Sequence, residues 1–288
     1  MKLISKAATV ILLTVFFIGL SVLLYPAVAQ YRNRRVQSKA VADYEQTLES
    51  LSRTDYAAVF QAAYDYNARL YALPAPLTDY AQLSDYRETL DANGSGMIGY
   101  LSIEKLRVEL PICHGTDAET LNSACGHLEG TSLPVGGTDT HAVLSAHRGL
   151  PHAKLFTDLD RLQLGDTFTV TVLDRVLTYE VDQIKTVLPN ETSDIQIRAG
   201  KDECTLLTCT PYGVNTHRLL VRGHRIAGTG GKRRCITSEA FLVDRLIVTP
   251  LAALPILLAL ILYVLLKPAK RTQAPDDPFR EEEGGQNE

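Results

Sequence analysis

Short β-branched runs, each bounded by Gly, Pro, Asn or Asp, follow one another from Met97 onward and restrict the fold more than any other feature. Runs of this kind are typical of β-strands. Helix-like segments are sparse here, at residues 118–123 and 153–159. Seven or eight strands at this spacing indicate an all-β-dominated fold with a closed or nearly closed barrel of about eight strands and short helices. The runs that we predict as strands cover residues 97–103, 107–112, 142–147, 167–173, 176–187, 204–209 and 217–226.

A helical extension, residues 36–92, precedes the barrel domain, which we assign to residues 93–228. Apolar side chains recur at helical spacing between residues 36 and 72, and a break near residues 52–55 predicts two helices. Pro74 and Pro76 end the second helix and predict a loop over residues 73–80. A further short helix is expected near residues 84–90.

Two uncharged apolar segments flank the central part of the chain, at residues 7–31 and 246–266. Each is long enough to cross the ~30 Å hydrocarbon core of a bilayer. Basic residues directly after the second segment favour a cytoplasmic C-terminus, so we expect both ends inside and the middle outside. The remaining divisions are an N-terminal segment (1–31), a linker (229–245), a transmembrane helix (246–266) and a disordered cytoplasmic tail (267–288).

The first apolar segment has two interpretations. Its length favours an uncleaved anchor, because signal-peptide cores usually span only ~7–15 residues. A cleaved signal peptide is the alternative, because a small-x-small cleavage site ends at Ala29. Charge does not decide between them, since three arginines within residues 32–35 outnumber the two lysines before the segment.

Charge and composition exclude several classes of function. The net charge of -4 over 288 residues gives no sign of nucleic-acid binding. The chain lacks ligand spacings such as Cys-x-x-Cys or His-Glu-x-x-His, so we expect neither a metal nor another cofactor. The catalytic domain is expected to be monomeric, with the lipid bilayer as a partner of the chain.

Three residues with complementary chemistry lie at the ends of predicted strands. Cys209 ends one run, His147 ends another, and Arg218 lies at the start of the last. A thiol attacks a carbonyl, an imidazole manages the proton, and a guanidinium stabilises the oxyanion or aligns the acyl group. The set suffices for acyl transfer. Thr208, directly before the thiol, is assigned to substrate binding.

Each of these roles has competitors. Six other histidines lack the context of His147, an apolar strand followed by glycine, although His217 neighbours the arginine. Arg222 shares a strand face with Arg218 but lies further from the strand end. A strand cysteine is more often a core residue than a nucleophile. Cys204 is assigned that core role, because its parity differs from that of Cys209.

Five cysteines are an odd number, which leaves one thiol free or paired with another chain. Cys113 and Cys125 flank a short helical segment and could form a disulfide, a question that the sequence leaves open. Cys235 lies in the linker and is interpreted as incidental.

The segments around these residues resemble one enzyme family. The string Thr205-Leu-Leu-Thr-Cys209, with the residues that follow it to Gly223, resembles sortases and in particular the pilus-building class C sortases. The similarity extends upstream through residues 126–137, 144–151 and 153–160, and roughly residues 85–228 are covered.

The resemblance implies a membrane-anchored cysteine transpeptidase on a sortase barrel. Sortases cleave a Leu-Pro-x-Thr-Gly-like sorting signal after its threonine, and pilus-type members pass the acyl group to a lysine amine of a pilin. Cys209 would be the nucleophile, His147 the general acid and then base, and Arg218 the ligand of the oxyanion or the signal backbone. This implies pilin or surface-protein substrates with C-terminal sorting signals, and a catalytic domain on the extracellular face of a Gram-positive cell membrane.

Two alternatives stay open. One is a housekeeping-type sortase that anchors proteins to a cell-wall peptide amine, and the other is a non-catalytic membrane-anchored assembly factor. The pilin and its acceptor lysine cannot be named from the sequence.

Class C sortases carry a lid in which an Asp-Pro-aromatic motif plugs the cleft. The matching place here reads Pro76-Leu-Thr-Asp79-Tyr80 and lacks the proline after the aspartate. Asp79 could still pair with Arg218 while Tyr80 covers Cys209. The alternative is that Asp79 only caps the short helix expected near residues 84–90.

Overall fold

The computed structural model describes residues 2–50, 53–92 and 94–227. The predicted linker, second membrane segment and tail, together with Cys235, lie outside these residues.

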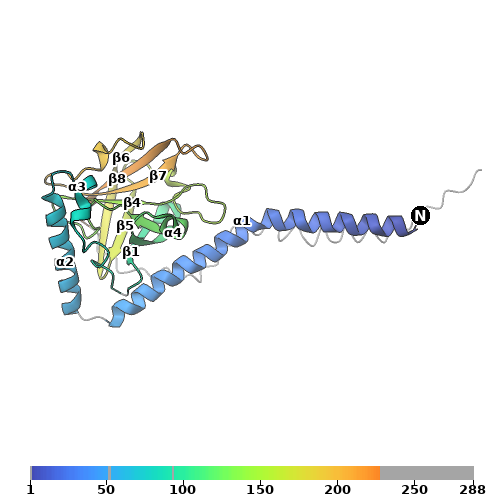
Figure 1. Ribbon diagram of the computed structural model, residues 1–288, viewed down its shortest axis with the longest axis horizontal. Helices are drawn as coiled ribbons and strands as arrows, with labels where there is room; N and C mark the ends of the chain where they lie inside the picture. Colours follow the sequence, from blue (N-terminus) through green and yellow to red (C-terminus); the bar gives the residue numbers. More distant parts are fainter. Residues whose placement is uncertain (1, 51–52, 93, 228–288) are drawn as a thin grey trace, which may run out of the picture. The chain divides into compact units, whose positions relative to one another are not determined.

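A closed barrel of eight strands forms the centre of the fold, as the strand pattern predicts (Figure 1). Neighbouring strands follow the order β1, β2, β3, β4, β7, β8, β6, β5, and β5 returns to β1. Two pairings are parallel, β2 with β3 and β4 with β7, and the others are antiparallel. The strands are β1 (Met97–Ile103), β2 (Val108–His114), β3 (Cys125–His127), β4 (Thr140–Ser145), β5 (Thr167–Val172), β6 (Arg175–Val187), β7 (Asp202–Thr210) and β8 (His217–Ile226).

The structure confirms the seven predicted strands to within two residues at each end. Strand β3 was not predicted, because three residues are too few to show a pattern of period two. Helix α4 (Ala118–Ser123) is confirmed. The helices expected at residues 84–90 and 153–159 are wrong: turns occupy both stretches, and only a 3-10 turn, Leu159–Arg161, follows the second.

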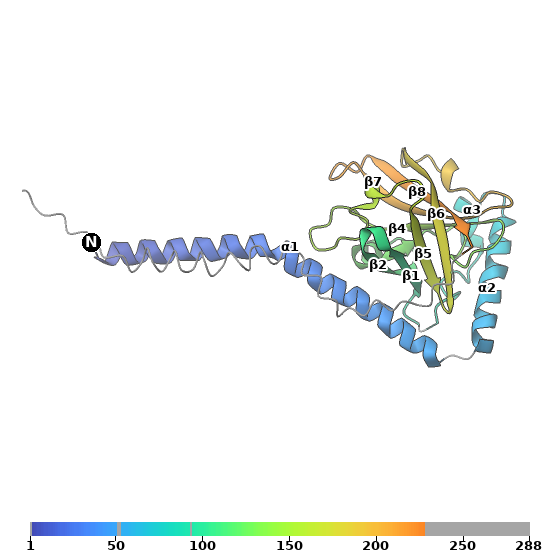
Figure 2. The same ribbon diagram turned by 180° about the vertical axis from the view of Figure 1, so that it is seen from behind.

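Two long helices and one short helix precede the barrel: α1 (Lys2–Ser50), α2 (Arg53–Tyr71) and α3 (Pro76–Asp79). Figures 1 and 2 show α2 beside the barrel, with α3 following it. Asn67 joins α2 to the barrel, because its side chain donates to the Leu133 carbonyl (3.1 Å) and accepts from the Leu133 amide (2.8 Å). Helix α1 runs without a break through the predicted boundary at residue 31.

The second half of α1 packs on the barrel through one helical face. Gln37, Val41, Tyr44 and Leu48 are buried, at the three- and four-residue spacing that lines one side of a helix. The Tyr44 hydroxyl donates to the Ile98 carbonyl (2.9 Å) and accepts from the amide of Leu173 (3.0 Å). These two bonds satisfy a hydroxyl that burial would otherwise destabilise.

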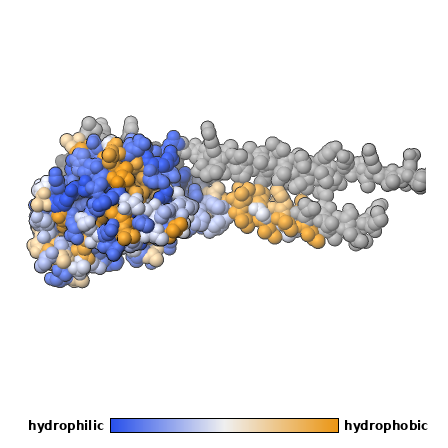
Figure 3. Space-filling view, turned by 90° about the horizontal axis from the view of Figure 1, so that it is seen from above, coloured by the Kyte–Doolittle hydropathy of each residue, from blue (hydrophilic) through white to orange (hydrophobic). Residues whose placement is uncertain are grey.

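The first half of α1 has a different surface. Large apolar side chains are exposed there. Figure 3 shows them as an apolar stretch of helix that extends away from the largely hydrophilic surface of the barrel. The helix is long and apolar enough to cross a membrane, by length and composition. The exposed apolar residues include Ile11, Val15, Phe17, Ile18, Val22 and Leu23.

The barrel interior contains Cys204, as predicted, between buried apolar neighbours. The disulfide considered between Cys113 and Cys125 is not formed, since Cys113, Cys125, Cys204 and Cys209 are all free. Burial raises the pKa of the Cys204 and Cys125 thiols, and it raises the pKa of Cys113 to about 11. These three thiols therefore stay protonated near neutral pH and are poor nucleophiles.

Candidate active site

Three adjacent strands bring the predicted reactive residues together. Strand β7 lies between β4 and β8 in the barrel. In the antiparallel β7–β8 pair, Cys209 is directly opposite Arg218. Residues directly opposite on neighbouring strands have Cβ atoms only ~4.5–5.5 Å apart, so the thiol and the guanidinium share one face of the sheet.

His147 approaches the same point from the other side of β7. Strand β4 runs parallel to β7 with Ser145 paired to Leu207, and the Ala146 amide continues the ladder by donating to the Leu207 carbonyl (3.2 Å). His147 is two residues beyond Ser145, and Cys209 is two residues beyond Leu207. The same register therefore places His147 beside Cys209, opposite the side on which Arg218 lies.

Thr208 faces away from this row and is buried, with 1% of its surface exposed. Its hydroxyl donates to the Ala146 carbonyl (2.8 Å), the carbonyl directly before His147. The observed contact of Thr208 is thus with the backbone that carries the histidine. This position suits support of His147 better than contact with a substrate on the outer face.

Arg218 and its competitor Arg222 have different partners. The Arg222 guanidinium donates to both carboxylate oxygens of Asp182 (2.9 and 3.3 Å) and lies 3.4 Å from Glu203. Arg218 donates to the backbone carbonyls of Asn215 (3.2 Å) and His217 (3.1 Å), and within the described chain no carboxylate forms an ion pair with it. Arg218 is therefore the arginine that can still receive a developing negative charge.

Comparison with known proteins identifies the family. A sequence profile of the sortase domain matches residues 101–226. The crystal structure of sortase C1 from Streptococcus agalactiae is 47% identical, with a TM-score of 0.63, and the match covers 66% of this chain and 99% of that one. The chain belongs to the sortase family.

Other matches agree. Streptococcus pneumoniae sortase C is 42% identical, with a TM-score of 0.62 over 67% of this chain and 100% of that one. Sortase D of Bacillus subtilis (strain 168) is 33% identical over 131 residues, 44% of this chain. That alignment spans only 63% of the Bacillus protein. The structural neighbours are thus class C sortases, and sortases are cysteine transpeptidases.

Three other histidines of this sortase are structural. His127 contacts the Tyr86 hydroxyl (2.9 Å) and the Ser132 carbonyl (2.8 Å), and burial lowers its pKa to about 4. Burial also lowers the pKa of His114 and His141. All three are neutral at physiological pH and hydrogen-bonded inside the protein. They are also buried, whereas His147 is half-buried.

The loops that carry the sortase site contact each other. Tyr212, in the turn after Cys209, lies against Gly149, where an added Cβ would come within 2.9 Å of its ring. Gly149 also has a φ of 80°, a left-handed conformation that favours glycine. Arg148 reaches the Thr210 hydroxyl (3.5 Å) and pairs with Asp160 (2.5 Å). The turn after the cysteine thus packs directly on the turn after the histidine.

The lid contacts differ from those expected. Asp79 accepts a hydrogen bond from its neighbour Thr78 (3.3 Å), and among the described residues it makes no ion pair with Arg218. The Tyr80 ring and the α3 backbone lie against Gly130, where an added Cβ would meet the Tyr80 ring at 2.9 Å. In this structure Tyr80 therefore contacts the β3–β4 connection, whereas Asp79 bonds to its own neighbour Thr78.

Leu77, which the sequence pattern did not single out, packs against an apolar cluster of the barrel. It packs in an apolar cluster that includes Leu207 and Leu220. Those two residues pair across β7 and β8, two positions before Cys209 and two beyond Arg218 on the same sheet face. An Asp-Pro-aromatic motif does not include Leu77. The signal in the sequence that could have indicated it is an apolar residue within a proline-containing loop.

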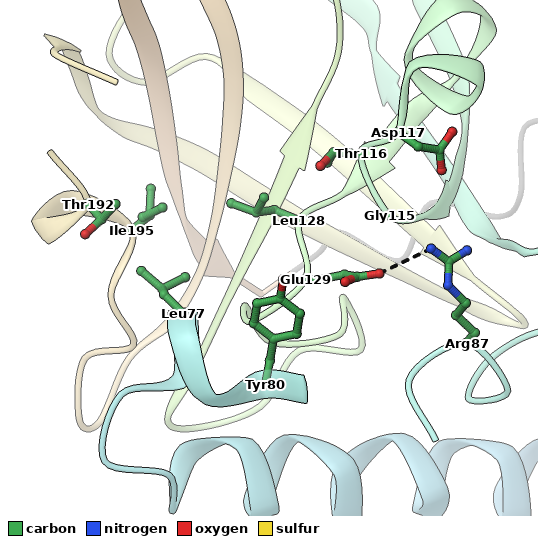
Figure 4. Close-up of a pocket in the computed structure, with 10 residues that line it drawn as sticks. All are labelled: Leu77, Tyr80, Arg87, Gly115, Thr116, Asp117, Leu128, Glu129, Thr192 and Ile195. Atoms are coloured by element: carbon green, nitrogen blue, oxygen red, sulfur yellow. Dashed lines mark hydrogen bonds and ion pairs between the residues drawn. The ribbon is translucent and has the colours of Figure 1, made fainter. Parts of the chain in front are cut away.

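A cavity of about 460 Å³ opens beside Leu77 (Figure 4). Leu77 from α3 and Tyr80, directly after α3, face Leu128 and Ile195 across it. Arg87 pairs with Glu129 at its other end (3.4 Å). The cavity is apolar around Leu77, Leu128 and Ile195 and charged where Arg87 pairs with Glu129. Its remaining lining residues are Gly115, Thr116, Asp117 and Thr192.

Proposed function

We propose that this sortase is a cysteine transpeptidase that cleaves a Leu-Pro-x-Thr-Gly-like sorting signal and joins it to a lysine amine of a pilin. The observation that carries the proposal is that Cys209 on β7 lies opposite Arg218 on β8, while His147 lies two residues beyond the end of the adjacent strand β4. The pilin assignment is supported by the class C neighbours, among them Streptococcus pneumoniae sortase C, which has been analysed for pilin substrate specificity. By this account the chain works in the envelope of a Gram-positive cell.

The first half-reaction would form a thioester on Cys209. The thiolate sulfur adds to the carbonyl carbon of the signal threonine, and Arg218 stabilises the oxyanion that results. When this intermediate collapses, the bond between threonine and glycine breaks. His147 donates a proton to the departing glycine amine, so the peptide fragment leaves as a neutral amine.

The second half-reaction would reverse these roles. The incoming lysine amine gives a proton to neutral His147 as its nitrogen attacks the thioester carbonyl. A new amide bond forms, the Cys209 sulfur leaves as thiolate, and Arg218 again stabilises the oxyanion. The enzyme returns to its starting protonation state without any external cofactor.

Incubation of the full-length protein with a sorting-signal peptide and a lysine-bearing pilin domain tests this function. Mass spectrometry should show an acyl adduct on Cys209 and then a pilin–peptide amide. Transfer only to a cell-wall peptide amine would favour the housekeeping alternative, and absence of any adduct would favour the assembly-factor alternative.

We propose further that α1 anchors the enzyme in the membrane with the barrel on the extracellular face. Support comes from the exposed apolar half of α1 and from the uncharged segment 246–266. External protease on intact cells should remove the barrel and leave a C-terminal tag protected. N-terminal sequencing that begins at Gln30 would instead show signal cleavage.

Segment 73–80 is proposed to act as a lid, with Leu77 as its plug and Asp79 and Tyr80 beside it. Leu77 packs in the same apolar cluster as Leu207 and Leu220, two residues on the sheet face of Cys209, which supports a plug at this position. The lid would therefore limit substrate access to Cys209.

A further inference from the structure

Three carboxamide side chains on one face of α1 hold the barrel close to the apolar half of the helix. They follow at intervals of three and four residues, so they lie in one row along the helix. Each donates its NH₂ group to a backbone carbonyl of the catalytic domain. The bonds run from Gln30 to Pro151 (3.5 Å), from Asn33 to His152 (3.3 Å) and from Gln37 to Ser123 (2.8 Å).

Two of the three carbonyls belong to the loop that follows the catalytic histidine. The Phe156 amide donates to the His147 carbonyl (3.1 Å) and closes this loop at its base. Pro151 is four residues from His147, and four residues of extended chain span at most about 14 Å. His147 therefore lies within that distance of the Gln30 contact.

Gln30 lies near the end of the uncharged segment of α1, so the loop that it contacts lies near the membrane boundary. The uncharged segment of α1 ends at Tyr31, and the first charged residue after it is Arg32. A helix leaves the hydrocarbon core near such a boundary. Pro26 precedes Gln30, and the buried side chains from Gln37 to Leu48 fix the later turns of the same helix to the barrel. The barrel is thus attached directly at the membrane boundary.

The exposed side chains at this boundary suit phospholipid headgroups. Arg32, Arg34 and Arg35 are exposed on α1, and the Arg35 guanidinium lies 5.2 Å from the centre of the Tyr31 ring. Tyrosine is enriched at membrane–water interfaces. Basic residues near an anionic membrane surface are attracted to its phosphate groups.

We propose that loop 148–153 and residues 31–35 of α1 form a membrane-apposed surface that contacts the phosphate headgroups of an anionic phospholipid bilayer. The inference rests on the proposed membrane anchoring. His147 then lies within about 14 Å of a loop residue that contacts the headgroups, given the reach of four residues. Such a site favours polypeptides that are themselves held in the membrane over peptides free in solution.

Depth-dependent quenching in lipid nanodiscs tests the proposal on the full-length chain. A fluorophore is attached through Pro151→Cys or, as the matched control, through Asp174→Cys, in a Cys209→Ala, Cys235→Ser background. Asp174 is exposed and follows Leu173, whose amide donates to the Tyr44 hydroxyl. Tyr44 is 14 residues beyond Gln30, which places it about 21 Å further along α1 and further from the membrane boundary. With headgroup spin-labelled phosphatidylglycerol, the label at 151 should lose fluorescence and the label at 174 should not. Equal quenching at both positions would overturn the proposal.

A second variant tests whether the carboxamides set this position. Gln30→Glu, Asn33→Asp and Gln37→Glu together keep the side-chain shapes but replace each NH₂ donor with an oxygen that repels a carbonyl. Quenching at 151 should be lost, whereas Lys39→Gln, an exposed change on the same helix, should leave it intact. Retained quenching in the triple variant would contradict the proposed role of these contacts.

Two further measurements separate this proposal from the proposed function. Co-elution of the chain with nanodiscs reports anchoring, and peptide cleavage by the Cys209-containing parent reports transpeptidase chemistry. If both succeed while the 151 label stays unquenched, only the membrane-apposed surface is wrong. In phosphatidylcholine discs quenching at 151 should fall, and unchanged quenching would refute the contribution of the arginines.

Discussion

Replacing Leu77 with alanine should expose Cys209 if Leu77 is the plug of the lid. The substitution removes three carbons from a half-buried side chain in the cluster with Leu207 and Leu220. At ~0.8 kcal/mol for each fully buried carbon, half burial predicts a loss of about 1.2 kcal/mol of lid contact. That energy changes the open-to-closed ratio about eightfold, since ~1.4 kcal/mol corresponds to tenfold.

The assay is the rate at which iodoacetamide alkylates Cys209, read by peptide mass spectrometry. Cys113 serves as an internal reference, because burial raises its pKa to about 11 and keeps its thiol protonated in every variant. An eightfold faster reaction is expected while the lid is mostly closed, and a smaller gain if the open state is already well populated.

Leu164→Ala is the matched control, because it makes the same chemical change at a leucine that is 66% exposed and outside the cluster. Its alkylation rate should equal that of the parent. Unchanged kinetics in Leu77→Ala would refute the plug and leave segment 73–80 as a linker. The double variant Asp79→Ala, Tyr80→Ala then tests separately whether the two lid residues predicted from the sequence slow the alkylation of Cys209.

Further outcomes follow from the chemistry of single residues. Cys209→Ala should abolish the acyl adduct in mass spectrometry while Cys204→Ala retains it, and an adduct that survives Cys209→Ala would disprove the nucleophile. Arg218→Lys should slow turnover roughly 10²-fold, because the planar fork of donors is lost. Arg222→Lys should instead lower the melting temperature and leave turnover unchanged, since the partners of Arg222 are carboxylates. If Arg222→Lys slowed turnover and Arg218→Lys did not, the roles of the two arginines would be exchanged. His127 has a pKa of about 4 when folded against 6.5 ordinarily, so the unfolded chain binds the extra proton between these values. The contribution of neutral His127 to the free energy of unfolding is complete above pH 6.5, and it falls by about 1.4 kcal/mol per pH unit as the pH decreases toward 4. The slope of unfolding free energy against pH should therefore be shallower in His127→Gln. An identical slope would contradict the assignment.

Most of the barrel could be predicted because its strands are long enough to carry a local signal. The run from Val176 to Val187 is β-branched and bounded by turn residues, whatever lies beside it. Strand β3 could not be predicted, since Cys125–His127 become a strand only by pairing with β2 and β4. The failure at residues 84–90 has a similar origin, because tertiary contacts such as the buried Tyr86 hydrogen bonds hold that stretch in turns.

The reactive residues could also be predicted from position. A cysteine and a histidine at the ends of apolar runs, with an arginine near the start of the next, lie at strand ends in any fold that keeps those strands. Strand parity also separated Cys204 from Cys209, because alternation is a property of a single strand. The sequence alone therefore determined the strands, the opposite faces of the two cysteines and the candidate set of three residues.

Only the tertiary structure decided which of these residues meet and what covers them. The placement of β7 between β4 and β8 puts Cys209 between His147 and Arg218, although 62 positions separate the cysteine from the histidine. Contacts with Asp182 and Glu203 engage Arg222. Leu77 packs in an apolar cluster that also contains Leu207 and Leu220, whereas the Tyr80 ring lies against Gly130. The physical reason is that pairing register, burial and ion-pair partners arise between segments distant in the chain, whereas residue patterns report only the backbone near each residue.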